Sequence, residues 1–135
     1  MRKWVELAER CEKAMGPDRE IDAAMAKALG LVPPGLTPGA SRGYEARFSN
    51  SAGLVWDAPY YTTSLDAIAA LIERKLPGWR VRWHTDGDGV HEAFLEDKGD
   101  FDAIDARHTE TFAASPALAL CAAFCRAMNE KEANA

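Results

Sequence analysis

The segment that most constrains the fold is an apolar stretch near the C-terminal end of the chain, residues 116–129. Ser115 and Pro116 predict where a helix starts, because serine is a favoured N-cap and proline suits the first helical turn. Apolar side chains then cover most of the helix circumference before Arg126. A helix of this kind is buried on more than one side. We therefore expect it to pack on a sheet, with further cover from another helix or another subunit.

Two amphipathic helices are expected at the N-terminal end. Residues 2–15 place apolar side chains on one stripe at the helical period, with Glu6 and Arg10 forming an i,i+4 pair on the wet face. The next helix begins at Pro17, which suits a first helical turn, and Gly30 predicts its C-terminal cap.

A third helix is expected after a capping box in which Thr63 is the N-cap and Asp66 lies three residues later. This helix runs to about Leu76, where a Pro-Gly pair ends it. Residues 79–84 then alternate between apolar and polar side chains, which predicts a strand. The Asp-Gly pairs at residues 86–89 predict a hairpin turn into a return strand.

Three other stretches complete the prediction. Residues 44–48 and 54–56 read as strands that pair with or extend one another, and the acidic stretch 96–110 reads as turns with a short strand near 101–104. Together the elements predict one domain over residues 1–135, with a Pro/Gly-rich loop at 31–43. The fold class is an α+β sandwich, a small and mainly antiparallel sheet with helices on both faces.

Composition and net charge limit the classes of protein to which this chain can belong. Of the 135 residues, 47% are hydrophobic and 27% charged, which is typical of a globular protein rather than a disordered chain. The formal net charge of −5 is unfavourable for non-specific nucleic-acid binding. No apolar stretch reaches the roughly 18 residues that span a bilayer, so no membrane partner is expected. The odd number of cysteines and the lack of a secretory signal indicate a reducing, cytoplasmic setting.

The best candidate for a binding site is the polar face of the strand at residues 79–84. Arg80, Arg82 and His84 share that face, and arginine binds phosphate groups with two hydrogen bonds. Tyr60 and Tyr61 precede a helix N-terminus, where an anion is also favoured, and their rings could stack on a base. The alternative is a solvated strand face with no ligand.

Other constellations favour structural roles. Asp86 and Asp88 resemble the start of a calcium loop but lack the later ligands, so a plain hairpin turn is the better interpretation. His84, His91 and His108 have no metal-ligand spacing, although the first two could face each other across the hairpin. We therefore expect no metal site and no cofactor.

Two further groups of residues also favour structural roles over chemical ones. Cys121 and Cys125 lie mid-helix among apolar residues, which indicates burial rather than nucleophilic reactivity. The acidic run over residues 96–105 reads as a solvated loop, with an acidic surface for a basic protein as the alternative.

The order of these pieces resembles the phage ABA-sandwich domain, a family of small phage and prophage proteins. The match rests on residues 6–12, 16–22, 59–67, 77–79 and 115–123. Each of these stretches is a cap, a turn or a core helix rather than a catalytic motif. The resemblance implies a sheet between layers of helices and a phage or prophage gene, and it brings no known activity and no functional residues.

These observations predict a non-catalytic phage or prophage accessory protein in the cytoplasm of a bacterial host. It would act by binding, either to an anionic nucleotide signal or to a host protein, in evasion of host defence. The apolar last helix favours a homo-oligomer. Two alternatives stay open, a virion-associated or structural interaction protein and a small hydrolase without a recognisable motif.

Overall fold

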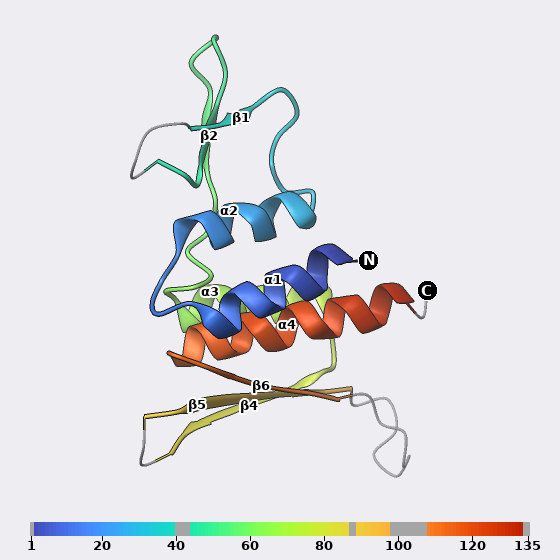
Figure 1. Cartoon of the computed structure of the whole chain (residues 1–135). Helices are drawn as coiled ribbons and strands as arrows, with labels where there is room; N and C mark the ends of the chain where they lie inside the picture. Colours follow the sequence, from blue (N-terminus) through green and yellow to red (C-terminus); the bar gives the residue numbers. More distant parts are fainter. Residues whose placement is uncertain (1, 40–43, 87–88, 98–107, 134–135) are drawn as a thin grey trace.

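The computed structural model describes residues 2–39, 44–86, 89–97 and 108–133, and its elements lie in layers (Figure 1). A central layer holds three helices, α1 (Arg2–Lys13), α3 (Leu65–Lys75) and α4 (Pro116–Ala133). On one side lies an antiparallel sheet of β4 (Arg80–Thr85), β5 (His91–Glu96) and β6 (His108–Ala113). On the other side lie α2 (Arg19–Ala28) and a smaller antiparallel sheet of β1 (Thr37–Pro38), β2 (Arg47–Ser49) and β3 (Val55–Asp57). The expected α+β class is confirmed, because helices pack against small antiparallel sheets. The sequence predicts one sheet between layers of helices, whereas the structure has two sheets with the helices between them.

Helix α4 is the centre of the main hydrophobic core, as its apolar sequence predicts. It is covered within this chain by α1, α3 and the sheet β4-β5-β6. Its alanines let the sheet approach the helix backbone closely, so that Thr111 Oγ1 donates to the carbonyl of Ala119 at 2.6 Å. Thr109 Oγ1 donates to the carbonyl of Ala123 at 3.1 Å. The apolar circumference of α4 therefore gives no support to a homo-oligomer, which stays a prediction.

The last helix is longer than predicted. The sequence predicts a helix that ends near Asn129, whereas the helix continues to Ala133. Two contacts hold its final turns. The indole nitrogen of Trp4 donates to Glu132, and Lys131 Nζ donates to the carbonyl of Lys75 at 2.9 Å. These partners come from α1 and α3, so the sequence of the helix alone does not reveal the extension.

The larger sheet has one face toward α4 and one face toward solvent. The register pairs Val81 with Leu95 and Trp83 with Ala93, so these residues lie on the α4 side. The hairpin predicted at residues 86–89 is confirmed by the pairing of β4 with β5, although residues 87–88 lie outside the described part. The sequence pattern does not predict strand β6, because two of its core-facing residues, Thr109 and Thr111, are polar. The strand expected near 101–104 lies outside the described residues.

The smaller sheet packs against α2 and forms a second small core. Phe48 is buried there beside Ala23 and Ala26, with the half-buried Trp56 across from it in the register. The predicted strands at 44–48 and 54–56 do pair, at bounds shifted by one to three residues. Most of the described part of the loop at 31–43 is irregular, except that β1 pairs with β2.

Two predicted helix starts are corrected, that of α3 by one residue and that of α2 by two. Ser64, not Thr63, caps α3, because the backbone nitrogens of both residues donate to the carbonyl of Tyr60 and this turn delays the helix. Ser64 Oγ then accepts from the backbone nitrogen of Ala67 at 3.1 Å. Pro17 precedes α2, and Asp18 is its N-cap. Gly30 follows that helix with φ +71, which confirms the predicted glycine cap.

Candidate functional site

The predicted strand-face residues lie where the sequence placed them, on the solvent side of β4. Arg82 and His84 come together around the ring of Phe94, with the Arg82 guanidinium 5.2 Å from the ring centroid. The His84 ring stacks on Phe94 at a centroid distance of 6.3 Å. A shallow hollow of about 580 Å³ lies here.

Charge compensation makes this face a poor anion site. Arg82 Nη2 donates to Glu96 Oε1 at 3.0 Å, and Arg80 Nη1 lies 3.7 Å from the other oxygen of Glu96. By the strand register, Glu92 and Glu110 occupy the same face. Among the described side chains, this face therefore carries two guanidinium groups against three carboxylates. An incoming anion would have to displace Glu96 from both arginines.

The two tyrosines are not part of this hollow. Tyr61 is only 2% exposed and lies in the main core, where burial raises the pKa of its phenol. Tyr60 is exposed, but its ring lies against the guanidinium of Arg19 at 3.7 Å from the centroid. Arg19 is in turn fixed by the carbonyls of Ala58 and Pro59 at 2.8 and 3.2 Å. The structure therefore brings Arg80, Arg82 and His84 to one face without either tyrosine.

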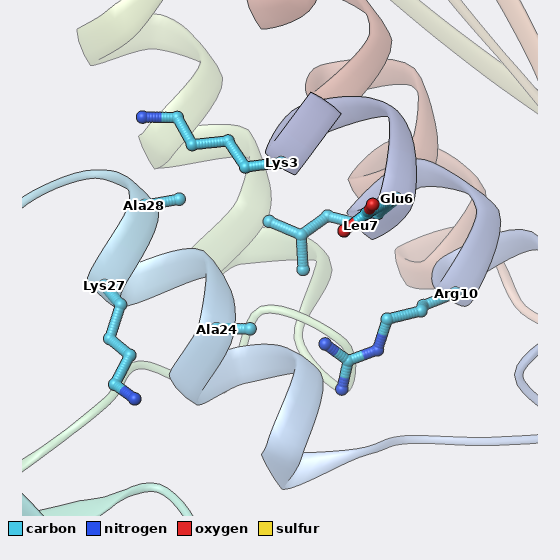
Figure 2. A pocket seen from close by; sticks show the side chains of 7 residues that line it. All are labelled: Lys3, Glu6, Leu7, Arg10, Ala24, Lys27 and Ala28. Atoms are coloured by element: carbon cyan, nitrogen blue, oxygen red, sulfur yellow. The ribbon is translucent and has the colours of Figure 1, made fainter. Parts of the chain in front are cut away.

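A second hollow lies between the first two helices and has a different charge balance (Figure 2). Its volume is about 420 Å³. The lining side chains from α1 are Lys3, Glu6, Leu7 and Arg10, and those from α2 are Ala24, Lys27 and Ala28. We call this hollow the α1–α2 groove.

The geometry of two packed helices explains why these residues meet. Lys3, Leu7 and Arg10 recur at intervals of three and four residues, so they follow one face of α1. Ala24 and Ala28 are small and half-buried, which leaves space on the facing side of α2. In Figure 2 the guanidinium of Arg10 reaches toward α2.

The α1–α2 groove carries excess positive charge. Three cationic side chains and one carboxylate, that of Glu6, line it. In the described part of the chain, Arg10 and Lys27 form no ion pair. The expected pair between Glu6 and Arg10 is therefore not formed. The sequence does indicate that Lys3 and Arg10 share one face of the first helix, because they are two helical turns apart. It does not indicate that α2 packs against this face, because that depends on tertiary packing.

The cysteines are structural, as expected. Cys11, Cys121 and Cys125 are all fully buried. Cys121 Sγ donates to the carbonyl of Tyr61 at 3.2 Å, and burial raises the pKa of the Cys121 and Cys125 thiols well above the usual value. Hydrogen bonds from these two thiols lower the pKa of Cys11. Because none of the three reaches solvent, none is placed to attack a substrate.

The remaining candidates do not converge either. His84 pairs with Glu92 and His91 with Thr85, so the two histidines lie on opposite faces of the hairpin and do not face each other. Within the described residues, no group of three potential ligands is arranged to hold a metal ion. Asp88 and residues 98–105 of the acidic run lie outside the described part.

Comparison with protein-family models, with curated proteins and with solved structures finds no match to this chain. Within the described residues, none of the helices is both long enough and apolar enough to cross a bilayer.

Proposed function

We propose that this protein acts by binding a small anionic ligand in the α1–α2 groove, without catalysing a reaction on it. The observation that carries the proposal is the uncompensated charge of Arg10 and Lys27 beside Lys3, around a floor of Leu7 and alanines. The strand face, although richer in arginine, already has its positive charge balanced by the carboxylates of Glu92, Glu96 and Glu110.

The groove suits a ligand with two or more negative charges and a small apolar part. Phosphate groups fit this description, since lysine and arginine both bind them through charge-assisted hydrogen bonds. Each such bond contributes about 1.5–3 kcal/mol, so two or three of them give a dissociation constant on the order of micromolar to millimolar. The lining residues belong to two helices that pack into the main core, and α2 also has an N-cap, Asp18, so little ordering is needed on binding.

The cellular role that we propose is that of a phage or prophage accessory protein. It rests on the resemblance described above, and it makes a nucleotide signal of host defence the candidate ligand. Sequestering such a signal requires binding alone.

Thermal shift measurements test the proposal. The ligands are inorganic pyrophosphate, a cyclic dinucleotide and ADP-ribose, each at low and high salt. We expect at least one of them to raise the melting temperature at low salt, and the double variant Arg10→Gln, Lys27→Gln to abolish that rise.

The matched control removes two positive charges from the strand face, in Arg80→Gln with Arg82→Gln. This variant should keep the ligand-induced shift. A shift lost in the control and kept in the groove variant would contradict the proposed site, and no shift with any of the three ligands would contradict anion binding.

A second candidate function, binding of a host protein, is favoured by the smaller sheet. That sheet projects from the helical layer in Figure 1, and its outer hairpin exposes the apolar side chains of Leu54 and Val55 by 64% and 55%. Exposed apolar residues that lie together mark interaction surfaces. A host protein captured by the wild type and lost with Leu54→Asp and Val55→Asp would support this function, and equal capture by both would contradict it.

A further inference from the structure

A third hollow, of about 340 Å³, lies beside α3 and differs from the α1–α2 groove in chemistry. Its walls are mostly apolar and come from separate parts of the chain. Trp56, Pro59 and Leu71 are the larger wall residues, while Ala67, Ala70 and Arg74 line it from α3. Its volume is at the lower end of the range for small-molecule sites. We call it the Trp56 pocket.

The sequence of α3 explains why space is left there. Ala67, Ala70 and Arg74 recur at intervals of three and four residues on one side of the helix. The two alanines do not fill the gap toward the segment that precedes the helix. On the far side, the Trp56 ring is held by its neighbour across the strands, Phe48, at a centroid distance of 5.9 Å. The pocket therefore has a fixed aromatic wall facing a helix with small side chains.

The lining of the Trp56 pocket contains one positively charged side chain, that of Arg74. Arg74 is exposed, and it forms no ion pair with any carboxylate of the described residues. The other ionisable group in the lining is Tyr61, whose phenol is neutral near pH 7, since burial raises its pKa further above the ordinary 10.0. The charge complementary to this pocket is thus a single negative one.

We propose that the Trp56 pocket binds a flat aromatic molecule that carries one negative charge, such as an aromatic carboxylate or sulfonate. The aromatic body packs against Trp56 and Leu71, and the anionic group pairs with Arg74. This site goes beyond the function proposed above, because its lining shares no residue with the α1–α2 groove.

A fluorescent probe of this chemistry is 8-anilino-1-naphthalenesulfonate, whose emission rises in apolar sites. Titrating the folded protein should give a saturable rise with one site per chain. Arg74→Gln should weaken binding about tenfold, the loss expected for one charge-assisted hydrogen bond. Lys13→Gln, which removes an exposed charge away from the pocket, is the control for net charge and should leave the affinity unchanged.

A second pair of variants tests the position of the probe. Ala70→Phe fills the pocket from an exposed position of α3, whereas Ala69→Phe adds the same side chain at an exposed position outside it. We expect Ala70→Phe to abolish binding and Ala69→Phe to preserve it. Near-ultraviolet circular dichroism shows that each variant is folded.

Three results would overturn the proposal. They are the absence of a saturable signal, equal affinity in Ala70→Phe and wild type, and equal affinity for the uncharged analogue N-phenyl-1-naphthylamine. The variant Arg10→Gln, Lys27→Gln separates this site from the groove, because it should bind the probe normally. Loss of probe binding in that variant would indicate that the probe binds in the α1–α2 groove, and this result would also overturn the proposal.

Discussion

A buried aspartate joins the second helix to the segment before the third. Asp22 is fully buried and accepts a hydrogen bond from the backbone nitrogen of Thr62 at 2.8 Å. Arg19 Nη1 donates to its other oxygen, also at 2.8 Å. Sequence alone gives no sign of this network, because Asp22 lies in the first turn of α2, where an acidic residue needs no explanation beyond the helix dipole.

Asp22 should make stability depend on pH in an unusual direction. Burial is the largest influence on its pKa and raises it above the ordinary 3.8, despite the opposing hydrogen bonds from Thr62 and Arg19. A carboxyl group with a raised folded-state pKa takes up its proton more readily in the folded chain, so its contribution to stability grows as pH falls through that pKa. We predict that the free energy of unfolding of the wild type, relative to Asp22→Asn, increases from pH 7 toward pH 4. Urea unfolding at several pH values measures this difference, and a decrease would contradict the assignment.

The buried thiols should be unreactive in the folded protein. Cys11, Cys121 and Cys125 have no exposed surface, so the lowered pKa of Cys11 does not make it accessible. We predict that Ellman's reagent modifies the native protein only at the rate of unfolding and modifies all three cysteines at once in denaturant. Rapid modification of one thiol under native conditions would show that the core opens around it.

At the scale of elements, capped helices are well predicted by the sequence, whereas strand β6 is not. Serine, proline and glycine signals locate helices within a few residues, since caps are local chemistry. Strand β6 has Thr109 and Thr111 on its core side, and their burial depends on carbonyl groups of α4. A contact between two elements cannot be deduced from the sequence of one of them.

The close approach of α4 to the sheet should make its alanines intolerant of larger side chains. Ala123 is fully buried, and its carbonyl accepts from Thr109. We predict that Ala123→Leu lowers the free energy of unfolding by about 1–3 kcal/mol, because it forces apart a packed interface. The control is Ala69→Leu at an exposed position of α3, which should change stability by less than about 0.5 kcal/mol. Chemical denaturation of both variants measures this, and equal stabilities would contradict the packing described.

At the scale of the whole molecule, the class of fold could be predicted and the layer order could not. The apolar α4 does require cover on several sides, but sequence does not say that α1 and α3 supply it. The candidate site could likewise be predicted only in part. Arg80 and Arg82 are visible as a motif, whereas their ion pairs with Glu96 and the cationic lining of the α1–α2 groove appear only when elements are packed.

The first and last helices are joined by a hydrogen bond between Trp4 and Glu132, in addition to the ion pair between Glu12 and Arg126. The indole of Trp4, a buried residue, donates to Glu132 near the end of α4. We predict that Glu132→Ala lowers the free energy of unfolding by about 1 kcal/mol, which corresponds to a melting temperature lower by roughly 4 °C. Glu132→Gln retains an acceptor oxygen and should restore most of the loss. Calorimetry distinguishes the variants, and identical melting temperatures for all three proteins would contradict a role for this contact.

The central claim is that the molecule holds an anion between its first two helices. The most direct measurement is a titration of isotope-labelled protein with inorganic pyrophosphate, followed by amide chemical shifts in a two-dimensional nitrogen–proton spectrum. The account predicts saturable shifts concentrated in α1 and α2 around Lys3, Arg10 and Lys27. Shifts concentrated on β4 around Arg80 and Arg82, or no saturable shifts at all, would contradict it.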